Sequence, residues 1–129
     1  MRTLDRTGLP RTEVYFYRDA DGFLPLLKWL DELPGKVQLK CTARISRLAE
    51  MGNQLHRPEA DYLRDGIFEL RARYQGIHYR ILYFFSGKAA VVLSHGITKE
   101  REVPAKEIDR AIQRREQVKS DFEQYTFQP

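Results

Sequence analysis

The sequence lacks most features of secreted, membrane-spanning and disulfide-bonded proteins. It has one cysteine, Cys41, so no internal disulfide can form, as is usual in a reducing compartment. No apolar run approaches the ~20 residues that a membrane-spanning helix needs. Arg2 and Arg6 are not followed by an apolar segment, so we expect no secretory signal. The length of 129 residues suits one domain. We therefore expect a cytoplasmic protein of a single domain.

Familiar cofactor and metal motifs are also missing from the sequence. There is no glycine-rich phosphate loop, and the three histidines are too scattered for a paired-His metal site. Asp and Glu are numerous, but none forms the spaced acidic cluster typical of magnesium-dependent nucleases. Cys41 lies on the apolar stripe of an expected helix, which favours a buried structural thiol over a nucleophile. We expect no cofactor, so any catalysis would be metal-free.

What the chain does have is positive charge, and it is unevenly distributed. The net charge is +4. Between Arg64 and Arg115 there are eleven Lys or Arg residues against six Asp or Glu, an excess of five, whereas the flanking segments nearly cancel. Basic residues gathered in one segment favour a polyanionic partner such as nucleic acid. An ordinary solvated surface explains the same charge equally well.

Hydrophobic periodicity and turn residues divide the chain into strands and helices. We expect strands at 13–17, 67–74, 77–85 and 89–95, and helices at about 23–30, 36–51 and 104–118. Residues 53–64 read as a loop. This order predicts an α+β fold, a small and mainly antiparallel sheet with two N-terminal helices packed on one face and a C-terminal helix. The domain spans 13–118, preceded by an N-terminal arm, 1–12, and followed by a tail, 119–129.

The most informative segment is a pair of alternating runs, Ile67–Tyr74 and Ile77–Phe85, which meet at Gln75-Gly76. A glycine-containing break of two residues between such runs predicts a β-hairpin. Arg71 then lies opposite Arg80, and the two cations repel each other. An anion between them would offset the repulsion, which points to phosphate and so to nucleic acid. One face is apolar and suits the core: Phe68, Leu70, Ala72, Tyr79, Ile81 and Tyr83. The other, which we expect to be exposed, is polar: Glu69, Arg71, Arg73, His78 and Arg80.

Two histidines can complete this polar face. A two-residue turn at Ser86-Gly87 would pair His78 with His95, and Arg80 with Leu93. A turn changed by one residue would send His95 to the core side instead. In RNA cleavage the 2′-hydroxyl can be the nucleophile, arginines can hold the phosphate, and a histidine can carry the proton near neutral pH. Each histidine taken singly is more often an ordinary strand residue.

Other polar residues also have two explanations. The second helix carries a basic stripe at i, i+4 spacing: Lys36, Lys40, Arg44 and Arg47. Such a stripe is most often a solvated face. Lys40 and Arg44, together with Arg73, are nevertheless candidates for RNA contacts. Glu69 and Arg71 can equally form a plain salt bridge on a wet sheet.

Several motifs occur in an order that carries a family resemblance. They are Tyr17-Arg18-Asp19, Asp21-Gly22, Trp29–Pro34 (WLDELP), Leu63–Arg71 (LRDGIFELR), Tyr79–Tyr83 (YRILY) and His95–Lys99 (HGITK). In this order the chain resembles the phage-derived, HigB-type branch of the RelE/ParE toxin superfamily of type II toxin–antitoxin systems. The resemblance spans about residues 13 to 118.

The resemblance implies a RelE-like fold and a metal-free mRNA endonuclease that acts on the ribosome. It also implies a partner, a helix-turn-helix antitoxin encoded beside the toxin. Carried over by position, the functional basic residues are Arg71, Arg80 and Lys99. Arg101 lies close by, and like Lys99 it follows the last strand closely enough to lean over the polar face. Glu100 stands where a second lysine is usual, which weakens the local attraction for phosphate.

Two functions remain open. The first is an endoribonuclease toxin, for which the candidate catalytic residues are Arg71, Arg80, Lys99, His78 and His95, and the candidate RNA-binding residues are Arg73, Arg101, Lys40 and Arg44. The alternative is a non-catalytic module that binds RNA or an acidic protein with the same basic face. The arginines serve either function, whereas a proton-transfer pair is required only by the endonuclease.

Overall fold

The computed structural model describes residues 11–98 and 101–129. Lys99 and residues 1–10 of the expected N-terminal arm lie outside the described residues. The elements follow in the order β1 (Glu13–Tyr17), α1 (Pro25–Asp31), α2 (Gly35–Met51), η1 (Gly52–Gln54), β2 (Ala60–Arg64), β3 (Ile67–Tyr74), β4 (Ile77–Ser86), β5 (Ala90–Thr98), α3 (Ala105–Ser120), α4 (Phe122–Tyr125) and β6 (Thr126–Phe127).

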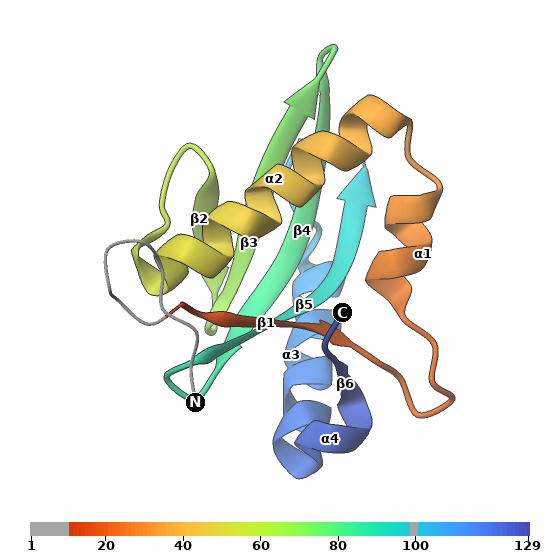
Figure 1. The fold of residues 1–129 in the computed structure, drawn as a ribbon, viewed down its shortest axis with the longest axis vertical. Helices are drawn as coiled ribbons and strands as arrows, with labels where there is room; N and C mark the ends of the chain where they lie inside the picture. Colours follow the sequence, from red (N-terminus) through yellow and green to blue (C-terminus); the bar gives the residue numbers. More distant parts are fainter. Residues whose placement is uncertain (1–10, 99–100) are drawn as a thin grey trace.

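Within the described residues, six strands form one sheet in the order β2-β3-β4-β5-β1-β6 (Figure 1). Strand β1 runs parallel to β5, and the other neighbouring pairs are antiparallel. This confirms the α+β class and the mainly antiparallel sheet. The C-terminal segment returns to the sheet, because β6 pairs with β1 at Phe16–Phe127 and Tyr17–Thr126.

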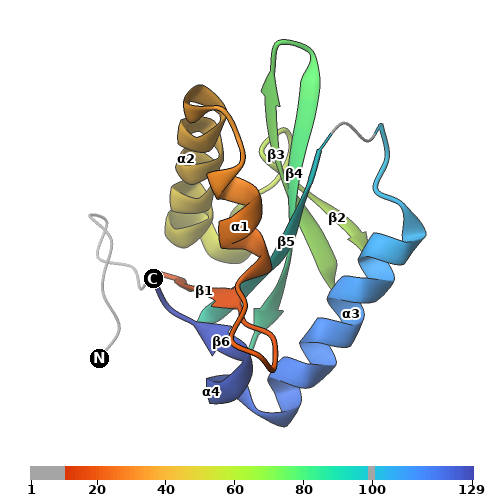
Figure 2. The same ribbon diagram turned by 90° about the vertical axis from the view of Figure 1, so that its right-hand side faces the viewer.

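Helices cover both faces of the sheet (Figure 2). Helices α1 and α2 lie on one face, as predicted, whereas α3 lies on the face that we expected to be fully exposed. That expectation was wrong because the polar face of the hairpin becomes apolar along its length. Ile67, Leu82 and Phe84 are buried there against α3, which contributes Ile108, Ala111 and Val118. Only the part of this face nearest the hairpin turn keeps its polar side chains.

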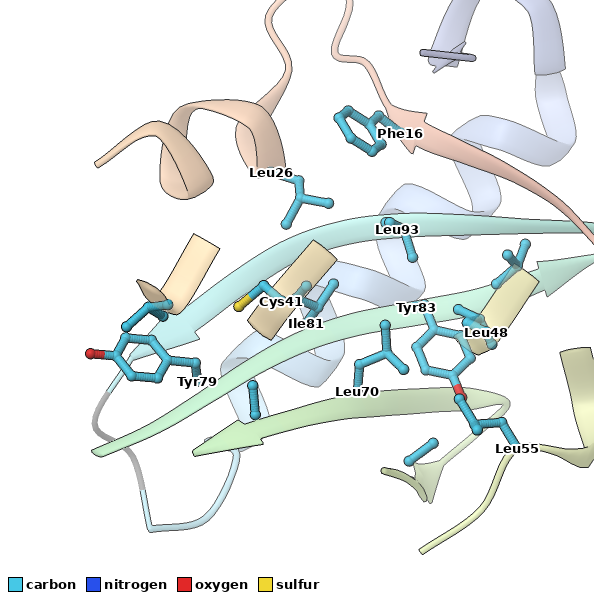
Figure 3. Packing of buried hydrophobic residues seen from close by; sticks show 14 residues of the cluster. Phe16, Leu26, Cys41, Leu48, Leu55, Leu70, Tyr79, Ile81, Tyr83 and Leu93 are labelled. Carbon is cyan, nitrogen blue, oxygen red and sulfur yellow. The ribbon is translucent and has the colours of Figure 1, made fainter. Parts of the chain in front are cut away.

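The core between the sheet and the two N-terminal helices contains Leu70, Tyr79, Ile81 and Tyr83 of the hairpin (Figure 3). Ala72 is also part of it, and Phe68 packs against it. Cys41 is buried in this cluster, and burial raises the pKa of its thiol to about 11. The thiol therefore stays protonated near neutral pH, which confirms the structural assignment of Cys41. No helix among the described residues is both long and apolar enough to cross a membrane.

Strand β2 was missed, because residues 53–64 were expected to form only a loop. Ala60 and Tyr62 pair with Leu70 and Phe68 of β3 in the antiparallel sense. The segment is short and interrupted by Asp61, so its own strand preference is weak. Its backbone pairing with β3 and the burial of Ala60 outweigh that preference.

Gly96 lets α1 lie directly on β5. The Trp29 ring covers Gly96 so closely that a Cβ there would overlap the indole. The indole Nε1 donates a hydrogen bond of 3.0 Å to Thr98 Oγ1, which fixes the ring across the strand. Beyond Leu93, β5 pairs with β4 along one edge, but β1 no longer pairs with its other edge, and Trp29 lies over this stretch.

We predict that Gly96→Ala lowers the free energy of unfolding by about 1–3 kcal/mol, since the indole must move to admit the methyl group. Gly35→Ala is the matched control, because a Cβ at Gly35 meets nothing within 4 Å. Urea denaturation of both variants measures the difference. Equal stability of the two would contradict the close contact.

Candidate nucleic-acid interface

The hairpin register is confirmed. Gln75 and Gly76 form the turn, both with positive φ (49° and 80°), as the tight hairpin turns require. Strand β3 pairs with β4 so that Arg73 faces His78 and Arg71 faces Arg80. We use the term hairpin face for five residues on this side of the two strands: Glu69, Arg71, Arg73, His78 and Arg80.

The anion between Arg71 and Arg80 belongs to the protein itself. Glu69 Oε1 lies 2.7 Å from Arg80 Nη1 and 3.2 Å from Arg71 Nε, and Glu69 Oε2 lies 3.2 Å from Arg80 Nη1. The Glu69 side chain is only 2 % exposed. The inference that the paired arginines need an external phosphate was therefore wrong, because Glu69 supplies the opposite charge. What remains for a polyanion is the surplus of cations.

Burial and its neighbours act on Glu69 in opposite directions. Desolvation raises the pKa of Glu69, and the charges of Arg80 and Arg71 oppose this rise. Arg80 Nη1 donates to both carboxylate oxygens of Glu69, and the two side chains are buried from solvent. Breaking such a buried pair leaves an uncompensated charge.

Arg80 is fixed from both ends of its guanidinium. Its Nη1 donates to Glu69, and its Nη2 donates a 2.6 Å hydrogen bond to the carbonyl of Arg101. The side chain is 8 % exposed. Arg80 therefore holds the segment that follows β5 against the hairpin, and it is better fixed than Arg73, which is exposed beside the turn. The exposed basic groups around it are those of Arg71, Arg73 and Arg101.

The predicted pairing of the last two strands was wrong. The turn between β4 and β5 has three residues, because Ser86 pairs with Ala90, and a bulge then lies between Leu82 and Tyr83. His95 consequently pairs with Leu82 and not with His78. The three-residue turn moves residues 90–93 to the opposite faces from those predicted, and the bulge at Ser94 returns His95 to the face covered by α3.

The structure therefore does not bring the two histidines together. His78 lies four residues along β4 from the partner of His95, which at the usual rise of a strand is roughly 13 Å. Desolvation, followed by the charges of Arg80, Arg73 and Arg71, lowers the pKa of His78. It is thus neutral near pH 7 and able to accept a proton.

His95 is buried beneath α3. Its Nδ1 lies 2.7 Å from Ser94 Oγ, and its Nε2 lies 3.4 Å from Glu107 Oε1. Burial, with smaller effects of Arg114 and Arg110, lowers the pKa of His95 to about 3. The contact with Glu107 is therefore one between a neutral imidazole and a carboxylate, not an ion pair.

The remaining candidates lie elsewhere. Arg44 extends from α2, on the opposite side of the sheet, and its Nε donates a 2.9 Å hydrogen bond to the Arg71 carbonyl. Its Nη1 also lies 3.7 Å from Glu59, so Arg44 ties α2 to β3. Lys40 is exposed on the same helix. In residues 11–98 and 101–129, no cluster of three or more His, Cys, Asp or Glu is placed to hold a metal ion.

Two features of this surface were not singled out from the sequence. Arg57 Nη2 lies 2.9 Å from Asp61 Oδ2. Asp61 is on β2, directly opposite Glu69 of β3. This pair extends the alternating charges to the sheet edge. The salt bridge between Glu69 and Arg71, which the sequence analysis offered as the plain explanation of these residues, is confirmed. Asp61 could be placed only once β2 was recognised.

We predict that Glu69→Gln lowers the free energy of unfolding by about 3 kcal/mol, because the two guanidiniums lose their shared buried carboxylate. Glu50→Gln is the matched control. Glu50 is 42 % exposed and lies 3.9 Å from Arg47, so its loss should cost less than about 1 kcal/mol. Urea denaturation at neutral pH gives both values. Similar costs for the two variants would show that Glu69 does not stabilise the hairpin face.

The buried His95 predicts a pH dependence of stability. Its native pKa of about 3 lies below the ordinary value of 6.5, so between these values the unfolded chain binds a proton that the native protein does not. The free energy of unfolding should therefore fall as pH decreases through this window, by up to about 1.4 kcal/mol per pH unit. His95→Gln should flatten the curve, whereas His56→Gln, at an exposed position, should not. Parallel curves for His95→Gln and the unmodified protein would contradict the burial of a neutral imidazole.

The family model for Gp49-like phage-derived proteins (DUF891) matches residues 28–116, a span that runs from α1 into α3 and includes the whole hairpin face. This family belongs to the RelE/HigB-like toxins. No curated protein matches the chain.

Proposed function

The chain belongs to the Gp49-like family of phage-derived proteins, and from that premise we propose that it is the toxin of a type II toxin–antitoxin system. We assign it to the HigB-type branch, with a RelE-like arrangement of the sheet and helices. Its proposed activity is metal-free cleavage of mRNA on the ribosome, in the cytoplasm. Its proposed partner is a helix-turn-helix antitoxin encoded beside it.

The observation that carries this proposal is the geometry around Glu69. The carboxylate holds Arg71 Nε and Arg80 Nη1 on the same oxygen, so the two guanidiniums are fixed before any substrate arrives. Arg71 remains 38 % exposed, and its unused N–H groups can donate to a phosphate. Preorganised donors are the groups that best stabilise charge developing in a transition state.

The chemistry needs little else. The 2′-hydroxyl loses its proton and attacks the neighbouring phosphorus, negative charge accumulates on the pentacoordinate phosphate, and the bond to the 5′-oxygen breaks. The products are a 2′,3′-cyclic phosphate and a 5′-hydroxyl, which takes its proton from water. His78 is neutral near pH 7 and lies on the hairpin face, so it can take up the hydroxyl proton. Arg71 stabilises the developing charge, while Arg73 and Arg101 bind the flanking backbone. Arg80 acts through Arg71 and Arg101 by holding both in place.

One observation favours the alternative, a non-catalytic module that binds RNA or an acidic protein. His95 is buried and does not meet His78, so the proton-transfer pair expected from the sequence is not assembled. The same basic surface would bind a polyanion without cutting it.

Expression in cells distinguishes the two functions. We predict that induction of the unmodified protein arrests growth and truncates transcripts. Arg71→Ala should reduce cleavage by about 100-fold or more, the usual cost of a lost transition-state donor. Arg80→Ala should reduce it by a similar factor, because Arg71 and Arg101 are then no longer held in place. Arg73→Ala should weaken it only partially and in a salt-dependent way. Lys119→Ala, which removes an exposed charge at the far end of α3, should have no effect.

Circular dichroism checks that each variant is folded. Because Arg80 is buried, Arg80→Lys is measured as well; it keeps the charge but cannot donate to Glu69 and Arg101 in the same geometry. A folded Arg71→Ala protein that cleaves normally would refute the endonuclease assignment. Normal growth and intact transcripts with abundant folded protein would favour the binding module.

A further inference from the structure

A second candidate site lies away from the hairpin face, at the edge of β5. It is a pocket of about 430 Å³ lined by residues of α1, β5 and α3. Figure 2 shows α1 on one side of β5 and α3 on the other. Pockets of this size accept small organic ligands. The residues that line the pocket include Phe23, Trp29, His95, Glu107, Arg110 and Arg114. The pocket exists because β1 leaves β5 after Leu93, and α1 covers only part of the edge that is left.

The wall of the pocket contains a chain of hydrogen bonds. Arg114 Nη1 lies 3.4 Å from Ser94 Oγ, and Ser94 Oγ lies 2.7 Å from His95 Nδ1. The guanidinium can only donate, so the serine oxygen accepts from it, while the histidine tautomer decides which of Ser94 Oγ and His95 Nδ1 donates to the other. The chain ends at His95 Nε2.

The end of this chain lacks a partner. His95 Nε2 and Glu107 Oε1 are buried, and neither has a hydrogen-bond partner among the described residues. They lie 3.4 Å apart but make no hydrogen bond with each other. His95 is more than nine-tenths buried. A ligand hydroxyl or a water beside these two atoms could hydrogen-bond to both.

The charges of the pocket favour an anionic ligand. Two carboxylates line it, and each already faces a cation: Glu32 pairs with Lys28, and Glu107 Oε1 lies 3.2 Å from Arg110 Nη1. Within residues 11–98 and 101–129, Arg114 forms no salt bridge, and its guanidinium lies 4.7 Å from the centre of the Tyr17 ring. The Arg110 side chain is 52 % exposed and keeps further N–H donors.

The pocket also contains aromatic surface, which the hairpin face lacks. Trp29 forms its inner wall over Gly96, and Phe23 at the rim is 45 % exposed. Tyr79 and Tyr83 of the hairpin are buried in the core and cannot stack on a base. Aromatic rings beside arginines are the usual combination for binding unpaired nucleotides.

We propose that this pocket binds a nucleoside monophosphate unit, with its base against Phe23 and Trp29 and its phosphate on Arg110 and Arg114. This goes beyond the proposed cleavage, because it assigns a second site that neither requires nor performs chemistry. The unit is either a free nucleotide or one residue of an RNA strand. Ile97 pairs with Arg80 of the hairpin face and is two residues from His95 of the pocket. An RNA strand bound to the hairpin face therefore passes close to the pocket.

Trp29 is the only tryptophan of the chain, so its fluorescence reports binding in this pocket directly. The full-length protein is titrated with each 5′-nucleoside monophosphate, with a short single-stranded oligoribonucleotide whose 2′-hydroxyls are methylated against cleavage, and with inorganic phosphate. We expect saturable changes in Trp29 emission with a mononucleotide, the oligonucleotide or both. A response to the mononucleotide indicates a free nucleotide as ligand; a response to the oligonucleotide alone indicates an RNA residue.

Phe23→Ala and Arg110→Ala should each weaken the binding by about tenfold, a typical loss for one stacked ring or one phosphate contact. Lys106→Ala is the control, because Lys106 is an exposed cation of α3 outside the pocket, and it should bind normally. No change in emission with any nucleotide would overturn the proposal. So would an equal response to phosphate alone, or binding unaffected by Phe23→Ala and Arg110→Ala in folded proteins. Because no step measures cleavage or toxicity, failure here leaves the proposed endonuclease to be judged separately.

Discussion

The buried carboxylate of Glu69 is the interaction on which the hairpin face depends. Without it, Arg71 and Arg80 would stand opposite each other on paired strands with only repulsion between them. With the Glu69 carboxylate present, one of its oxygens binds both guanidiniums. Arg80 also donates a second hydrogen bond, from Nη2 to the Arg101 carbonyl. A single side chain thus sets the spacing of two cations and fixes the segment that follows β5.

The two cores explain why only part of the sheet is available for binding. The apolar side of the hairpin packs against α1 and α2. On its other side, the end far from the turn packs against α3. Polar side chains remain uncovered only near the turn, beyond the start of α3. The surplus of positive charge is therefore concentrated near the turn, on two strands that pair with each other up to Tyr74–Ile77. The pocket beside β5 arises from the same layering, at the point where β1 ends its pairing.

The sequence predicted the hairpin well and its surroundings less well. Gln75-Gly76 has a distinctive turn signature and the flanking runs alternate strictly, so the pairing of Arg71 with Arg80 followed from local rules. The Ser86-Gly87 turn had no such signature, and a turn of three residues with a bulge at Ser94 displaced His95. Strand β2 depends on pairing with β3, and Glu69 is bound by Arg80, whose guanidinium is also held by the Arg101 carbonyl 21 residues further along the chain. Neither is encoded in a local window, which is why the counter-ion was first sought outside the chain.

The role of the hairpin face is tested most directly by a crystal structure with a single-stranded RNA whose 2′-hydroxyls are methylated, so that it binds but cannot be cut. We expect a phosphate within hydrogen-bonding distance of Arg71, with the Glu69 carboxylate still bound to Arg80. RNA bound only elsewhere on the protein would contradict the assignment of the hairpin face. So would a phosphate that displaces Glu69 from between the two arginines, because the carboxylate would then be a stand-in for the substrate and not the group that positions its ligands.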